Sequence, residues 1–255
     1  MTSCATTFYQ VYNVKPNQEK NTKTDNLFFE DENCKITYDL WANGGNIGFD
    51  IYNKTDENVY VNLNESNFIL NGFAYDYYKN RTFTTSESKS ASAATTSAGS
   101  VAVTGINVYN NIQTNQVKSS SSANISSSVG YAVTIKEDSI IRIPAKTTKR
   151  ISEYSINSTR ITDCDLKKYP SRKTIKTKSY SIEQSPIIFS NIITYETKGE
   201  KMTVQNEFYV SEIANYPATE FFEYKYTEYC GKKSESKTKF NKFYNTDKFY
   251  IKYSK

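Results

Sequence analysis

The sequence predicts a mainly β protein: an antiparallel Ig-like β-sandwich with a long Ser/Thr/Ala-rich insertion and one helix near the C-terminus. Three observations support this class. Short segments alternate apolar and polar residues with a period of two, and turn-forming residues separate them at roughly ten-residue spacing. The 22 Tyr and 14 Phe residues suit half-buried strands, in which a ring packs inward and a hydroxyl reaches solvent.

The first strands are predicted between residues 34 and 78. Residues 34–40 alternate apolar and polar side chains, which indicates one buried face. The same pattern continues in residues 47–51 and 59–63, after turn-forming residues. Asn71-Gly72 then separates two apolar segments and is a strong signal for a two-residue hairpin turn.

The insertion covers residues 84–130. Both of its ends are rich in Ser and Thr, and only its centre, residues 101–117, carries β-forming residues. Such a segment buries too little apolar surface to offset the entropy of ordering it, so we expect a mobile loop with a hairpin at its centre. A binding loop, a glycan carrier and a tolerated surface insertion are all open readings.

After the insertion, further strands are predicted in residues 131–135, 139–144, 149–156, 187–197, 201–213 and 249–251. Residues 216–231 are predicted as the helix. Pro217 suits a first helical turn, Glu220 and Glu223 favour the positive end of the helix dipole, and Gly231 suits its end.

The domain boundaries follow from these elements. Residues 1–26 are predicted to be a lipid-anchor region with a flexible tether, and residues 27–160 a β-sandwich core that carries the insertion. Residues 161–255 are predicted to be a β-hairpin plus the helix, either packed on that core or forming a small second subdomain.

Composition restricts the chemistry. The chain has no histidine, which removes the commonest general base, the commonest zinc ligand and every Ser–His or Cys–His pair. Neither acidic cluster, at 30–33 and 56–58, has the spacing of a calcium loop. We expect no enzyme, metal or cofactor, although chemistry by paired carboxylates stays possible. The net charge of +5 comes mainly from Lys, which favours a solvated face and no nucleic-acid partner.

The cysteines suggest modifications. Thr2-Ser3-Cys4-Ala5 matches the end of a bacterial lipobox, and residues 17–25 contain no apolar side chain, which predicts lipidation at Cys4 followed by a tether. An ordinary early cysteine is the alternative. The signal peptide is missing, and we expect the precursor to carry one upstream. Cys34, Cys164 and Cys230 can form one disulfide at most, or serve as structural thiols.

Four segments resemble a group of uncharacterised envelope lipoproteins of Bacteroidales-type bacteria: residues 4–12 (CATTFYQVY), 44–56 (GGNIGFDIYNKTD), 68–72 (FILNG) with Tyr77 and Tyr78, and 208–213 (FYVSEI). The resemblance implies lipid anchoring at Cys4 and an extracytoplasmic address, but no particular chemistry. Because no acidic residue follows Cys4, the periplasmic face of the outer membrane is favoured over the cell surface. Such bacteria O-glycosylate Asp-Ser/Thr-aliphatic tripeptides, and Asp138-Ser139-Ile140 matches at Ser139.

These observations lead to three functional hypotheses. The first is a non-catalytic envelope lipoprotein that acts as an interaction or structural module, with an envelope protein or a glycan as partner. The second is a carbohydrate-binding or glycan-processing accessory protein, and the third is a phage- or secretion-related envelope component. Two carboxylates in a Tyr-lined cleft would favour the second hypothesis.

Overall fold

The computed structural model describes residues 6–17, 27–90 and 128–255. The protein is mainly β with antiparallel sheets, as predicted. Its strands are β1 (Thr7–Pro16), β2 (Phe28–Glu30), β3 (Cys34–Tyr38), β4 (Phe49–Asn53), β5 (Val59–Leu70), β6 (Phe73–Asp76), β7 (Thr82–Ser90), β8 (Ser128–Lys136), β9 (Ile140–Ile143), β10 (Thr148–Ile151), β11 (Thr177–Ser179), β12 (Ile188–Thr197), β13 (Glu200–Pro217), β14 (Phe222–Tyr229), β15 (Lys232–Asn241) and β16 (Lys248–Ser254). A short 3-10 helix (Arg172–Thr174) and helix α1 (Ala218–Phe221) complete the elements.

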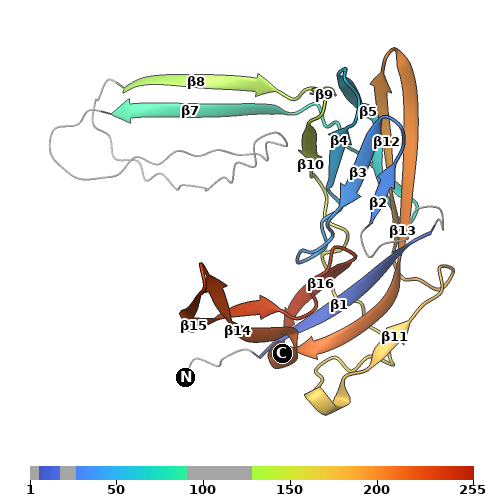
Figure 1. The fold of residues 1–255 in the computed structure, drawn as a ribbon, viewed down its shortest axis with the longest axis vertical. Helices are drawn as coiled ribbons and strands as arrows, with labels where there is room; N and C mark the ends of the chain where they lie inside the picture. The colour runs from blue at the N-terminus through green and yellow to red at the C-terminus, as the bar shows by residue number, and fades with distance from the viewer. Residues whose placement is uncertain (1–5, 18–26, 91–127) are drawn as a thin grey trace.

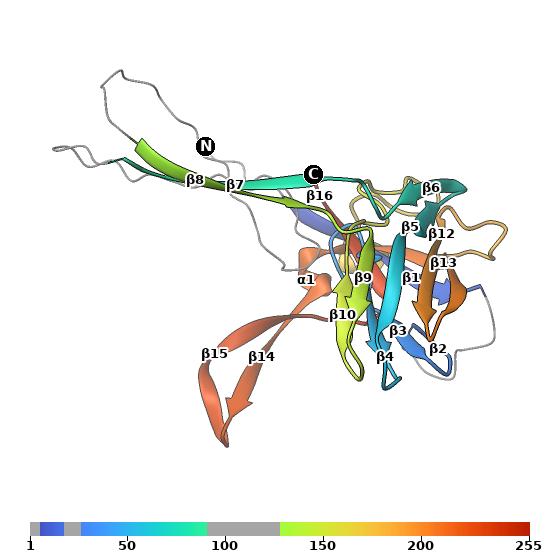
Figure 2. The same cartoon turned by 90° about the horizontal axis from the view of Figure 1, so that it is seen from above.

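Two sheets form a sandwich-like body. The larger sheet has eight strands in the order β16-β1-β13-β12-β5-β6, with β11 paired to β13 and β9 paired to β5. The smaller sheet has the order β10-β4-β3-β2 and lies beside the larger one (Figure 1). Two further hairpins, β7–β8 and β14–β15, project from this body, as Figures 1 and 2 show.

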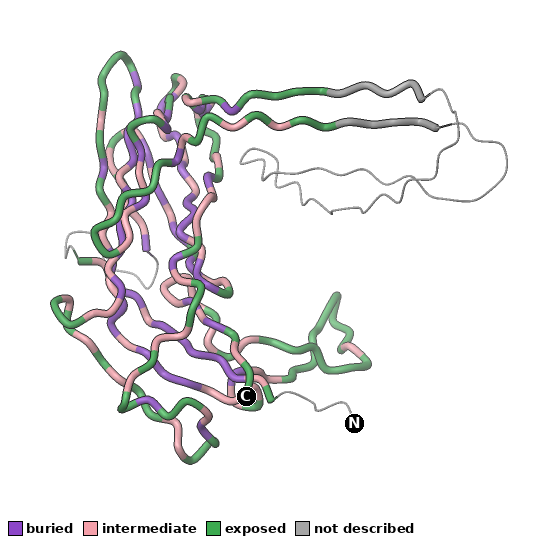
Figure 3. Tube along the Cα trace, turned by 180° about the vertical axis from the view of Figure 1, so that it is seen from behind, coloured by how far each residue is buried: buried purple, intermediate pink, exposed green. Residues whose placement is uncertain are grey.

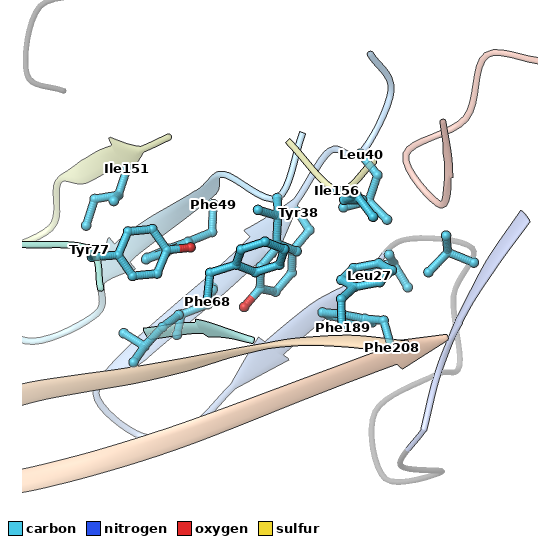
Figure 4. Packing of buried hydrophobic residues seen from close by; sticks show 14 of the residues in the cluster. Leu27, Tyr38, Leu40, Phe49, Phe68, Tyr77, Ile151, Ile156, Phe189 and Phe208 are labelled. Carbon is cyan, nitrogen blue, oxygen red and sulfur yellow. The ribbon is translucent and has the colours of Figure 1, made fainter. Parts of the chain in front are cut away.

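One hydrophobic core lies between the sheets. Alternate residues of the smaller sheet point inward, as the period of two predicts: Cys34, Ile36 and Tyr38 of β3 are buried. They meet aromatic side chains of the larger sheet, among them Phe189 and Phe208 (Figure 4). Figure 3 shows that burial follows this body and that the projecting hairpins are mostly exposed where their burial is described.

The turn predicted at Asn71-Gly72 is confirmed, and a second hairpin has a turn of the same kind. Asn71 and Gly72, with φ of 47° and 85°, connect β5 to β6, and Lys198 and Gly199, with φ of 53° and 77°, connect β12 to β13. Both residues of such a turn need positive φ, which Asn and Gly adopt most readily.

The prediction of a tether over residues 1–26 is wrong for β1. Thr7–Pro16 pairs with both β13 and β16, and Phe8 through Tyr12 are buried without interruption. One face of β1 joins the main core through Tyr12, and the other joins a second cluster through Tyr9 and Val11. A strand buried on both faces loses the alternating pattern by which a strand is recognised. Cys4 and residues 18–26 lie outside the described residues.

The predicted helix over residues 216–231 is also wrong. Only Ala218–Phe221 are helical, and the chain continues as hairpin β14–β15, closed by Cys230 and Gly231 with φ of 50° and 74°. Pro217 occupies the N-cap position, as its place in the sequence suggests. The aromatic residues Phe222, Tyr224 and Tyr226 of the predicted helix instead occupy alternate positions along strand β14.

The insertion begins and ends in regular structure. Its flanks pair as β7–β8, from Thr82 opposite Lys136 to Ser90 opposite Ser128, so the predicted loop over 84–130 is partly wrong. The hairpin predicted at residues 101–117 lies outside the described residues.

The predicted boundary at residue 160 does not separate two cores. Strands β12 and β13, from the second part of the chain, lie at the centre of the large sheet, and Leu166, Ile187 and Phe189 belong to the same core as Ile36 and Val61. The two parts therefore bury one another's apolar faces.

Candidate functional site

The three described cysteines are free thiols, so they form no disulfide with one another. Cys34 is buried in the core, and burial, with a smaller contribution from Asp31, raises its pKa to about 12. A thiol with such a pKa stays protonated and unreactive, as a structural cysteine does. Cys164 and Cys230 are both exposed. Cys164 lies in a turn before β11, and Cys230 lies at the tip of the β14–β15 hairpin.

Ser139 lies in a bend immediately before β9 and is half-buried. Its backbone carbonyl accepts a hydrogen bond from Leu63 N–H at 2.8 Å, which holds the bend against β5. The adjacent Asp138 is exposed. O-glycosylation at Ser139 stays a prediction.

A cluster of buried carboxylates lies where the β7–β8 hairpin meets the body. Arg81 donates hydrogen bonds to Glu137 at 2.6 Å and to Glu153 at 2.7 Å, and Lys79 donates to Glu153 at 2.8 Å. The backbone N–H groups of Lys79 and Arg81 donate to the second oxygen of Glu137. Tyr75, Tyr78 and Tyr154 line an adjacent hollow of about 590 Å³.

Both carboxylates of this cluster bind Arg81, and tyrosines line the hollow beside them. Burial alone would raise the pKa of Glu137, but hydrogen bonds from Arg81 and from backbone N–H groups outweigh burial and lower it. The acid of a glycosidase needs a raised pKa, so that it keeps a proton to donate. The cluster instead fixes the base of the β7–β8 hairpin to the body.

A groove of about 710 Å³ crosses the outer face of the smaller sheet. Its lining includes Trp41, Asp39, Asp50 and Arg150. Arg150 of β10 lies opposite Asp50 of β4 and donates two hydrogen bonds of 2.7 Å to its carboxylate. Asp39 accepts a hydrogen bond from the backbone N–H of Trp41 at 3.1 Å. The groove combines one indole with fixed charges.

The base of the β14–β15 hairpin is an aromatic cluster that is separate from the main core. Phe221 stacks on Tyr9 of β1 with a centroid distance of 3.9 Å and an interplanar angle of 5°. Phe222 meets Tyr9 edge to face, and Trp41 stacks on Phe221 at 6.0 Å. Tyr250 of β16 completes the cluster from the neighbouring strand. Since packed aromatic pairs stabilise beyond their buried area, this base holds the hairpin firmly on the sheet.

Beyond its base, the hairpin at residues 222–241 is exposed on both faces. We call this segment the Tyr/Lys hairpin. Its strands carry Tyr224, Tyr226 and Tyr229, which are 60%, 46% and 84% exposed, and Tyr244 just beyond β15 is 60% exposed. Large aromatic side chains at such exposure, gathered on one element, are typical of a contact surface.

Lysine ammonium groups lie over two aromatic rings of this hairpin, those of Tyr226 and Phe222. Lys233 and Lys237 lie over the ring of Tyr226, at 4.4 and 5.5 Å from its centroid, and Lys239 lies 3.5 Å from the ring centroid of Phe222. None of these three ammonium groups forms a salt bridge with a described carboxylate, whereas Lys225 pairs with Glu223 at 2.6 Å. The hairpin therefore presents free positive charge next to exposed aromatic side chains.

Sequence reasoning did not find this surface, because Phe221, Phe222, Tyr224, Tyr226 and Tyr229 fit helical spacing as well as strand spacing. Two signals were present nevertheless. Phe222, Tyr224 and Tyr226 alternate with Glu223 and Lys225, a strict period of two. Cys230-Gly231 separates two such alternating segments by two residues, the length of a tight hairpin turn.

Within the described part of the chain, no group of three or more Cys, Asp or Glu residues could hold a metal ion. None of the described helices is long and apolar enough to cross a bilayer. Comparison of the sequence with protein-family models and with curated proteins gives no match, and no solved structure matches the chain.

Proposed function

We propose that this protein is a non-catalytic interaction module of the cell envelope, held at the outer membrane by a lipid on Cys4, and that the Tyr/Lys hairpin is its contact surface. One observation supports this proposal above the others. The exposed aromatic side chains of Tyr224, Tyr226 and Tyr229 gather on a single projecting hairpin whose base is tightly packed.

The position of the hairpin supports the link to the anchor. Phe8, near the start of β1, pairs with Pro217, which lies five residues before Phe222, where the hairpin begins opposite Asn241. Thr6 accepts a hydrogen bond from Lys255 N–H at the same end of the sheet. Cys4 is two residues from Thr6, and consecutive Cα atoms are about 3.8 Å apart. A lipid on Cys4 would therefore be attached close to the base of the hairpin.

The described carboxylates support the non-catalytic part. Glu137 and Glu153 are saturated by Arg81 and Lys79, and Asp50 is held by Arg150. A carboxylate that already accepts several fixed hydrogen bonds is a poor proton donor or nucleophile, because reaction would first have to break them.

Site-specific photocrosslinking in native cells tests the proposal. A photoreactive phenylalanine analogue replaces Tyr226 in one variant and Tyr60 of β5 in the control, since the two side chains have similar exposure, 46% and 40%. We expect crosslinked product at position 226 and little at position 60. Equal or absent crosslinking at both positions would contradict the assignment. Intact mass of the native protein separately tests acylation at Cys4.

Glycan binding is a second candidate, and the groove beside Trp41 favours it. An indole next to fixed Asp and Arg side chains can stack on a sugar ring while it hydrogen-bonds the hydroxyls. Trp41 is the only tryptophan of the chain, so its fluorescence reports on this groove and on the aromatic cluster that it shares with Phe221. Titration with envelope oligosaccharides should change that fluorescence, and Asp39→Asn should weaken the response. A flat titration with every oligosaccharide would exclude this candidate.

A further inference from the structure

We infer that the Tyr/Lys hairpin binds the anionic headgroup layer of a lipid bilayer. This inference rests on the proposed function, because it names the partner of the surface assigned there. The hairpin carries a net positive charge. Strands β14 and β15 carry five Lys and three Glu. Glu223 is already paired with Lys225, whereas Lys233, Lys237 and Lys239 have no carboxylate partner among the described residues.

The lysines that lie over two of the rings favour an anionic surface as the partner. Sugars and bases stack on the open face of an aromatic ring. On this hairpin, lysine ammonium groups lie over the rings of Tyr226 and Phe222. The hairpin therefore offers a partner ammonium groups held beside two of its rings, together with the exposed hydroxyl-bearing rings of Tyr224 and Tyr229.

That combination is the one the membrane interface selects. Tyrosine places its ring at headgroup depth with its hydroxyl toward water, and lysine reaches the phosphates. Tyr229, at 84% exposure, lies at the tip beside Lys232 and Lys233. Nearer the base, a hollow of about 580 Å³ is lined by Lys239 and Tyr244 and by the ion pair of Lys225 with Glu223, so Lys239 is its cation without a described carboxylate partner.

The shape of the hairpin supports an extended flat partner. It is a two-stranded ribbon with both faces in solvent, so it cannot enclose a small ligand as a pocket does. Figure 2 shows it standing away from the sandwich. A bilayer surface can contact the tip and one face of such a ribbon together. With the lipid of Cys4 attached near the base, the acyl chain and the basic hairpin would supply two membrane signals, which together give stable anchoring.

Fluorescence at the tip measures this binding directly. In the full chain with Cys4→Ser and Cys164→Ser, Cys230 is the only exposed thiol and takes an environment-sensitive label, since Cys34 is buried. Vesicles of phosphatidylglycerol and phosphatidylethanolamine should shift the emission of the label. Vesicles of phosphatidylcholine alone should not, because they lack net negative charge.

A charge-matched pair of variants provides the control. Lys237→Gln with Lys239→Gln removes two lysines from the hairpin, and Lys136→Gln with Lys198→Gln removes two exposed lysines elsewhere. A lysine near an anionic surface contributes about 1 kcal/mol, so the hairpin variant should bind vesicles roughly 20- to 30-fold more weakly. The control variant should bind as the parent does.

Three outcomes would overturn the inference: no emission shift with anionic vesicles, equal weakening in both double variants, or a shift only with an acidic polysaccharide or an acidic protein. Crosslinks from position 226 to a protein or a glycan in cells, combined with no vesicle binding, would reject the bilayer and keep the interaction module. Absence of such crosslinks together with vesicle binding would keep the hairpin as the contact surface and leave the bilayer as its partner, in place of a protein or a glycan.

Discussion

At the scale of single residues, most buried charge is concentrated at Arg81. Its guanidinium holds Glu137 and Glu153, whose side chains are only 2% and 5% exposed. Two buried carboxylates are tolerated because one cation and several N–H groups satisfy them, and removal of that cation would leave both charges uncompensated.

Replacement of Arg81 tests this dependence. We expect Arg81→Met to lower the free energy of unfolding by about 3 kcal/mol, measured by urea denaturation. Adding Glu137→Gln and Glu153→Gln to that variant should restore part of the loss, since the uncompensated charges disappear. If Arg81→Met unfolds like the parent, the cluster has no structural role.

Glu137 also makes stability depend on pH. Its pKa in the folded protein lies below the ordinary value of 4.5, because hydrogen bonds from Arg81 and backbone N–H groups outweigh burial. A lowered folded-state pKa stabilises the fold above pH 4.5, and that contribution is lost as the pH falls through the folded-state value. The free energy of unfolding should therefore fall more between pH 5 and pH 3 in the parent than in Glu137→Gln. Parallel pH curves for the two proteins would contradict this assignment.

Alanine substitutions at two glycines distinguish the cost of backbone strain from the cost of overpacking. Gly45 and Gly72 both have positive φ, 72° and 85°, but a Cβ on Gly45 would lie 2.8 Å from Ile156 Cδ1, whereas a Cβ on Gly72 would meet nothing within 4 Å. Gly72→Ala should cost about 1–2 kcal/mol from the left-handed conformation alone. Gly45→Ala should cost about 1–3 kcal/mol more from overpacking. Equal losses in thermal or urea unfolding would show that the contacts around Gly45 relax freely.

At the scale of elements, the sequence identifies strands that have one buried face and misses those that do not. Strands β3 and β4 and the first part of β5, residues 59–63, alternate cleanly, and the turn after β5 contains residues that accept positive φ. Strand β1 is buried on both faces and so carries no alternation. In β14 the rings fit either period, and only the pairing with β15 and the packing of Phe221 on Tyr9 decide for the hairpin. Tertiary contacts therefore override local preference at both places.

The aromatic base makes a prediction for the hairpin as an element. Phe221→Ala should remove the stack on Tyr9 and speed the hydrogen–deuterium exchange of amides in residues 222–241, because the hairpin loses its fixed attachment. Tyr229→Ala at the tip should leave that exchange unchanged. If Phe221→Ala leaves exchange in the hairpin unaltered, the cluster does not hold it.

At the scale of the whole molecule, chain segments far apart in sequence build one body. The last strand, β16, pairs with the first, β1, and β13 runs from the sandwich to this terminal pair. The sequence could not predict this closure, because each strand's partner lies far along the chain and no local pattern specifies it. For the same reason no local pattern indicates the proposed contact surface, because its exposure depends on where the hairpin leaves the closed sheet.

Hydrogen–deuterium exchange of the native protein, compared between isolated cell membranes and the purified chain, tests the central claim most directly. Amides of the Tyr/Lys hairpin should exchange more slowly in membranes, because the partner covers them, while amides around the turn at Lys198 and Gly199 should exchange equally in both samples. Unchanged exchange across residues 222–241, with protection confined to another surface, would contradict the hairpin as the contact surface of this protein.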